Sequence, residues 1–182
     1  STIAFQAVAA AAPVPALAPA LPAVPTALRA DVTLLRTQLM PFMTGASGLN
    51  VKLNGKGDDY LSSSFKSMVQ TSIWRVRKLR GAIGAGLPRL TDSTLANPMN
   101  HQAIQTFIDT GRTAKEEVKE LCNIDNGFGE KILRDFQSLP VGSRKVKTTP
   151  AFRAEVARFK NAAEMSMPHL KAFEAAAARL PF

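Results

Sequence analysis

Apolar residues recur at helical spacing in the segment that contains the first charged residue of the chain, residues 25–40. The apolar positions of this segment fall on one face of a helix: Leu28, Val32, Leu35 and Leu39. Pro25 stands near the first turn, where proline is tolerated. Pro41 is expected to end or kink this helix, because proline lacks a backbone N–H and clashes with the preceding turn.

The clearest helical pattern begins near residue 60, after Asp58 and Asp59, either of which can cap a helix. Its apolar positions follow helical spacing: Leu61, Phe65, Met68, Val69, Ile73, Val76, Leu79 and Ile83. Gly81, Gly84 and Gly86 follow the basic residues of the last turns and predict the end of the helix. The Gly- and Asn-rich stretch before residue 58 predicts a loop with at most a small hairpin.

Two further long helices and a short one complete the pattern. One is expected from about Met99 to Leu121, and its apolar positions share a face: Ile104, Phe107, Ile108, Val118, Leu121 and Cys122. A short helix is expected over residues 128–137, and the last helix starts at Pro150 with a kink near Pro168. Strand-like alternation and internal repeats are nearly absent. The chain is therefore predicted to be all-α, an antiparallel bundle of four to five helices over residues 26–182.

Residues 1–25 are predicted to form an extended Ala/Pro-rich arm. They carry no charge and five prolines, each of which disfavours helix in the residue before it. The arm lacks the positive start of a secretory signal, and no proline-free apolar run is long enough for a transmembrane helix. Apolar surface of this density predicts docking on a partner protein. The expected partner-binding residues belong to the arm, the one tryptophan and the chain end: Phe5, Val14, Leu17, Leu21, Val24, Trp74 and Phe182.

The charge is strongly basic and unevenly placed. Lys and Arg number 23 against 14 Asp and Glu, a net charge of +9 at pH 7. Six basic residues and no acid lie between Tyr60 and Thr91, and several of them form a predicted basic ridge beside Trp74. A second basic stretch follows at residues 141–149. The residues expected to bind a polyanion or an acidic partner are Lys66, Arg75, Arg77, Lys78, Arg80, Arg89, Arg144, Lys145 and Lys147.

Basic zones of this kind indicate three partner classes: nucleic acid, an anionic membrane surface or an acidic protein face. The alternative is a solvated helix end whose cations complement the helix dipole. A mildly acidic middle, residues 92–140, separates the two basic zones. This alternation is compatible with a homo-oligomer in which copies meet head to tail.

No residues with catalytic or metal-binding spacing are found. The stretch LNGKGDD lacks the spacing of a phosphate-binding loop, and NIDNGFGE places Cys, Ile and Leu where a calcium loop needs oxygen ligands. His101 and His169 form no zinc-type set with Cys122, which is expected to be a buried small hydrophobe. The single cysteine also excludes an internal disulfide framework. Neither a cofactor, a metal nor a cellular compartment is therefore predicted.

Acidic and basic residues mix along residues 112–120, a pattern typical of a solvated helix face with ion pairs. Without a catalytic set, the leading hypothesis is a non-enzymatic structural or assembly subunit of a large complex. A virion or tail component, or an accessory subunit of an organellar complex, fits this description. The alternative is a nucleic-acid-binding helical module that uses the basic zones 66–89 and 141–160.

Overall fold

Four long α-helices contain most of the residues that the structure, a computed structural model, describes. They are α3 (Ala23–Thr44), α4 (Ser63–Thr94), α5 (His101–Glu117) and α7 (Pro150–Ala178). A 3-10 turn, η2 (Val118–Leu121), follows α5 directly. The description covers residues 23–44, 60–94, 100–122, 130–131, 134, 145–147 and 150–180. Apart from two three-residue strands, β1 (Tyr60–Ser62) and β2 (Lys145–Lys147), the regular elements of these residues are helices, so the predicted all-α character is confirmed.

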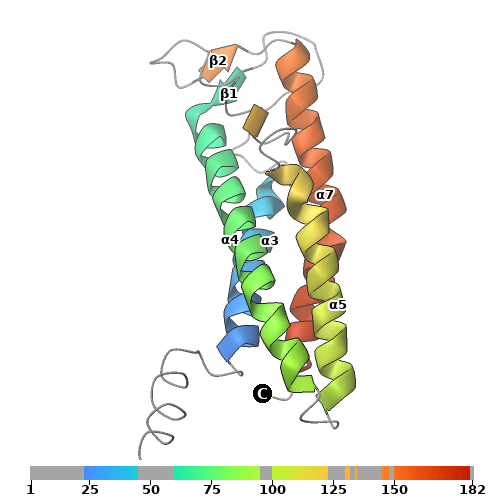
Figure 1. The fold of residues 1–182 in the computed structure, drawn as a ribbon. Helices are drawn as coiled ribbons and strands as arrows, with labels where there is room; N and C mark the ends of the chain where they lie inside the picture. Colours follow the sequence, from blue (N-terminus) through green and yellow to red (C-terminus); the bar gives the residue numbers. More distant parts are fainter. Residues whose placement is uncertain are drawn as a thin grey trace, which may run out of the picture.

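Each long helix packs against two others. Helix α3 contacts α4 and α7, and helix α5 contacts the same two helices. Figure 1 shows the four helices side by side, with two short strands at the end where α4 and α7 begin. Lys78 of α4 reaches Asp31 of α3, whereas Gly86, farther along α4, faces the earlier residue Val24. Helices α3 and α4 therefore run in opposite directions.

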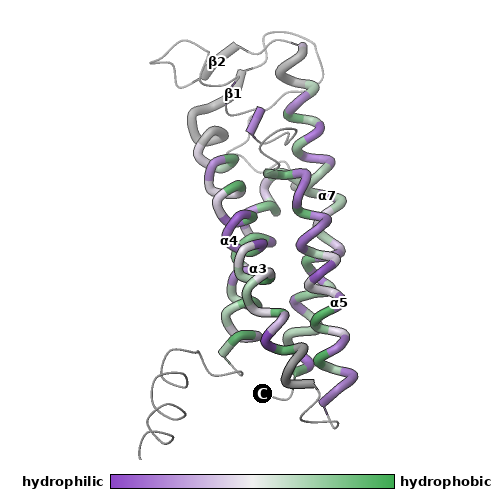
Figure 2. Tube along the Cα trace, in the orientation of Figure 1, coloured by the Kyte–Doolittle hydropathy of each residue, from purple (hydrophilic) through white to green (hydrophobic). Residues whose placement is uncertain are grey.

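The core forms where the apolar stripes of the four helices meet. Figure 2 shows hydrophobic and hydrophilic residues interspersed along every long helix, as a one-sided apolar stripe requires. Four phenylalanines are fully buried, and they form two ring pairs. Phe42 meets Phe159 edge-on with ring centroids 4.8 Å apart, and Phe107 meets Phe173 at the same distance. Each fully buried side chain of this size stabilises the fold by about 1.5–3 kcal/mol.

Helix α4 begins later and ends later than its sequence predicts. Residues 60–62 form strand β1 (Tyr60–Ser62), which pairs antiparallel with β2 (Lys145–Lys147), so the helix starts at Ser63. The predicted stop at three glycines is also wrong, because α4 continues to Thr94. A Cβ at Gly86 would lie only 2.9 Å from Val24 Cγ1. This glycine therefore allows α3 to approach closely, and packing outweighs its low helix propensity.

The start of α3 shows that the predicted extended arm was drawn too long. The helix begins at Ala23, so the last three residues assigned to the extended arm are helical. Val24, expected to bind a partner, is only 8% exposed and belongs to the chain's own core. Helix α3 also continues through Pro41 to Thr44, so this proline does not end it. The remainder of the arm, residues 1–22, lies outside the described residues, as does the loop predicted before residue 58.

Helices α5 and α7 agree with their predicted ranges. Residues 118–121, expected to be helical, tighten into the 3-10 turn η2. Helix α7 starts at Pro150, as predicted, and includes Pro168. Of the short helix expected over 128–137, only residues 130, 131 and 134 are described, and all three are helical. Among the described residues, no helix combines the length and the apolar character that crossing a membrane requires.

Candidate functional site on helices α4 and α5

Trp74 is a large hydrophobic side chain that is exposed on the outer surface of α4. Its neighbours Ile73 and Val76 point into the core, so the helical period turns Trp74 outward, where it is 56% exposed. Two cations lie over the indole: Arg75 Cζ at 5.7 Å and Lys78 Nζ at 5.4 Å from the ring centroid. Such exposed cation–π contacts contribute about 0.5–1 kcal/mol each. The three residues, called here the Trp74 face, were all predicted as site residues.

The basic residues of the predicted ridge do not form one continuous surface. Lys78 also pairs with Asp31 of α3 at 3.4 Å, and Arg77 pairs with Glu130. The half-buried Arg80 turns toward α5 and donates its Nε–H to the backbone carbonyl of Lys115 at 3.2 Å. The ridge is therefore divided between the α3 side and the α5 side of α4, and acids of the same chain neutralise part of it.

The charges of residues 112–120, which the sequence predicts to form one solvated face with ion pairs, lie on different sides of α5. Between α4 and α5 lies a hollow of about 150 Å³, called the α4/α5 hollow, and the described residues that line it include two cations and no acid. Its lining residues are Ile83, Gly84, Leu87, Pro88, Arg112 and Lys115. Two of the three acids, Glu117 and Glu120, face a different hollow of about 210 Å³ between α5 and α7. That α5/α7 hollow is lined by Glu117, Glu120, Arg158, Asn161, Ala162 and Met165.

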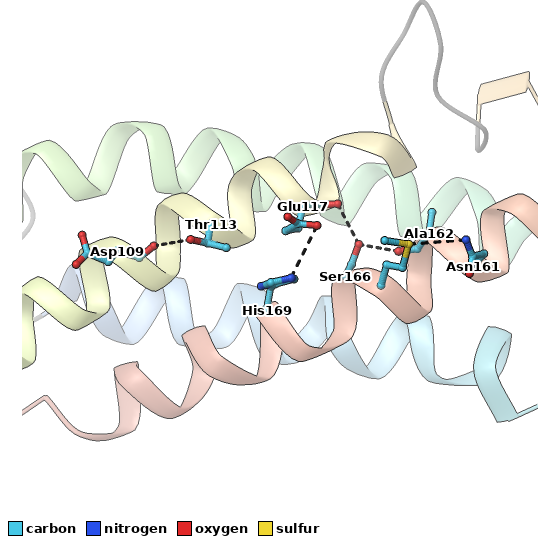
Figure 3. Close-up of polar contacts among 8 residues, drawn as sticks. Asp109, Thr113, Glu117, Asn161, Ala162, Ser166 and His169 are labelled. Atoms are coloured by element: carbon cyan, nitrogen blue, oxygen red, sulfur yellow. Dashed lines mark hydrogen bonds and ion pairs between the residues drawn. The ribbon is translucent and has the colours of Figure 1, made fainter.

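The polar contacts beside the α5/α7 hollow hold two helices together (Figure 3). Ser166 Oγ lies 2.8 Å from the carbonyl oxygen of Ala162 and 3.1 Å from that of Glu117, to either of which it can donate. His169 Nε2 lies 3.8 Å from the Glu117 carboxylate, beyond hydrogen-bond distance. Among the contacts of the described residues, none joins Ser166 to His169. The contacts that Ser166 and His169 make with Glu117 link α7 to α5.

Cys122 and the remaining histidine provide no reactive centre in the described part of the chain. Cys122 is buried, as predicted, and burial raises the pKa of its thiol although Arg80 and Arg77 lie nearby. A thiol of this kind stays protonated and poorly nucleophilic near neutral pH. His101 is exposed on the first turn of α5. No three His, Cys, Asp or Glu side chains among the described residues lie close enough together to hold a metal ion.

Several predicted site residues lie outside the part of the chain whose side chains the structure describes. Phe5, Val14, Leu17, Leu21, Arg144 and Phe182 fall outside the described residues, and only the backbone is described at Lys66, Lys145 and Lys147. Arg89 is half-buried on α4. Arg112 and Lys115 were not predicted as site residues, although their three-residue spacing places them on one helix face. No known protein family, curated protein or solved structure matches the chain.

Proposed function

We propose that this chain is a non-enzymatic assembly subunit of a larger complex. In this proposal its domain is an antiparallel helical bundle, and the Trp74 face docks on an acidic surface of a partner protein. The observation that supports it is the 56% exposure of the indole on a helix whose inner face is buried from Val69 to Leu90. Tryptophan is enriched among the residues that dominate the binding energy of protein interfaces.

The surroundings of Trp74 support a protein partner. Leu34 of α3, which is 44% exposed, follows Asp31 by one turn, and Trp74 precedes Lys78 by one turn. Because α3 and α4 run in opposite directions, Leu34 and Trp74 lie at the same level of the helix pair. Farther along α4, Gly81 is exposed and has open space where a side chain would stand. A partner element can therefore approach the backbone of α4 closely beside the two apolar side chains.

The charges around Trp74 define the chemistry of this partner. Arg75 and Lys78 flank the indole, so a carboxylate-bearing surface would complete the rim of the interface. The uncharged, proline-rich sequence of residues 1–22 supports a second contact, since prolines reduce the entropy lost when a segment docks. Contacts of this kind would hold the chain in its complex as a virion or tail component, or as an accessory subunit of an organellar complex.

The test compares two exposed apolar residues on different helices. The tagged chain is expressed in the cells that make it, and its sedimentation is measured as wild type, Trp74→Ala and Met165→Ala. Met165 on α7 is 61% exposed, so both substitutions remove a similar amount of exposed apolar surface. We expect Trp74→Ala alone to move the chain from a large particle to the monomer fraction, with an unchanged thermal midpoint. Wild-type chain that sediments as a monomer, or Trp74→Ala that stays in the particle, would contradict the proposal.

One observation favours a second candidate function, nucleic-acid binding. An exposed indole beside two cations is the combination on which single-stranded nucleic acids stack and neutralise phosphates. This function requires binding of a single-stranded oligonucleotide that weakens steeply with salt and is lost in Trp74→Ala. Affinity that hardly changes between low and moderate salt would exclude it.

A further inference from the structure

Two cations in the α4/α5 hollow have no acidic partner among the described residues. Arg112 and Lys115 lie three residues apart on α5 and both line this hollow. By contrast, Arg77 and Lys78 on the neighbouring helix each pair with a carboxylate. The hollow therefore brings together two positive charges that make no ion pair within the described part of the chain.

The shape of the hollow follows from Gly84 of α4. A Cβ at this position would lie 3.3 Å from Lys115 Nζ, so the ammonium group occupies the space that a side chain on α4 would take. Ile83 and Leu87 are buried beneath it and give the hollow an apolar floor. An apolar floor lowers the local dielectric, so the field of the two cations is screened less than on an open surface.

A third cation fixes the backbone of α5 at the same place. Arg80 crosses from α4 and donates its Nε–H to the carbonyl oxygen of Lys115. Its charge adds to that of Lys115 and Arg112. Of the three acids in this segment, Glu117 and Glu120 line the α5/α7 hollow, and the exposed Glu116 lines neither hollow.

We propose that the α4/α5 hollow binds a phosphate group through Arg112 and Lys115. A guanidinium binds two oxygens of such a group through parallel N–H donors, and an ammonium supplies a point charge to a third. The hollow of about 150 Å³ has room for one tetrahedral oxyanion between them. This site is separate from the Trp74 face, since Trp74 does not line the hollow, and the proposal does not depend on the proposed function.

The first experiment titrates the full chain with inorganic phosphate at constant ionic strength and follows backbone amide shifts. We expect saturable shifts at Gly84, Arg112 and Lys115. Lys115→Gln should weaken binding about tenfold, as loss of one charged hydrogen-bond partner typically does. Lys171→Gln is the control, since it removes the same charge from an exposed position on α7. Shifts that never saturate, or equal losses in both variants, would mean that phosphate senses only the net charge and would overturn the proposal.

The second experiment changes the shape of the hollow and leaves the charge unchanged. Gly84→Leu fills the space beneath the ammonium group, whereas Gly81→Leu, one turn earlier, enters space with nothing within 4 Å. Both substitutions replace glycine by a better helix former, so neither should lower the thermal midpoint. We expect only Gly84→Leu to weaken phosphate binding, by about tenfold or more. Wild-type affinity in Gly84→Leu would show that phosphate does not enter the hollow.

Two further measurements identify the source of the phosphate group. A short single-stranded oligonucleotide that displaces inorganic phosphate, and that Lys115→Gln also weakens, supports a nucleic-acid backbone as the source. Inorganic phosphate that binds without being displaced supports a free phosphate or a small phosphate ester. Binding of neither probe overturns the site. Trp74→Ala should bind phosphate like the wild type, so the docking proposal and the phosphate proposal can fail independently.

Discussion

Gly111 lies where α5 meets both α4 and α7, and its replacement by alanine tests the packing of all three helices. A Cβ at this position would lie 2.9 Å from Phe173 Cε1 and 3.2 Å from Leu87 Cδ1. Alanine in a helix interior is favoured over glycine by about 0.5–1 kcal/mol. An extra carbon forced into a packed core costs about 1–3 kcal/mol. We therefore expect Gly111→Ala to destabilise the fold by about 1 kcal/mol net.

The neighbouring side chains cannot move away at low cost. Phe173 is fully buried, and its ring packs against that of Phe107 with the ring planes tilted by 32°. Gly81 on α4 provides the opposite case, because a Cβ there meets nothing within 4 Å. Gly81→Ala should stabilise the fold by about 0.5–1 kcal/mol. The same chemical change is thus expected to have opposite signs at the two positions.

Urea unfolding followed by circular dichroism measures both variants. A loss of about 1 kcal/mol corresponds to a thermal midpoint about 2–4 °C lower in a chain of this size. Adding Phe173→Leu removes the ring that the new methyl group contacts, so the double mutant should show a coupling energy of about 0.5–3 kcal/mol. If Gly111→Ala stabilised the fold as much as Gly81→Ala, α5 and α7 would lie farther apart than the structure places them.

Two further predictions follow from titratable groups. Burial alone raises the pKa of Glu174, but hydrogen bonds from Thr33 and Arg36 outweigh it, so the pKa lies below its ordinary value of 4.5. The stability from this carboxylate is therefore present above pH 4.5 and lost as the pH falls through the folded pKa, and Glu174→Gln should remove this acid dependence in urea titrations. Because burial raises the pKa of Cys122, the native thiol should react with a disulfide reagent far more slowly than in urea; equal rates would contradict its burial.

Hydrophobic periodicity was sufficient to predict the buried faces of α3 and α5. The predicted stripe of α3, from Leu28 to Leu39, is buried at every position, and that of α5 likewise lies in the core. This succeeds because burial of a continuous stripe is the main term that stabilises an amphipathic helix. The predicted end of α4 was wrong because the rule used there was local. Gly86 weakens the helix by itself, but its contact with Val24 and Leu28 belongs to the folded chain.

The pairing of β1 with β2 could not be predicted from the sequence, because it too depends on contacts between distant parts of the chain. Tyr60 pairs with Lys147, and nothing in either short sequence indicates a partner so distant along the chain. The separated charges of α5 are a different case. Their positions around the helix could be predicted from the sequence, because helical spacing places Arg112 and Lys115 on one side of α5 and Glu117 on another. Only the neighbours α4 and α7 turn those two sides into a basic and an acidic hollow.

The two proposed sites use opposite edges of α4. The Trp74 face lies toward α3, because Lys78, which covers the indole, also reaches Asp31. The α4/α5 hollow lies toward α5, where Lys115 rests over Gly84. A partner on the first surface therefore leaves the second open to an anion, and one helix can serve both contacts at once. The exposed glycines of α4, which suggested a helix end in the sequence, instead provide the space on which both contacts depend.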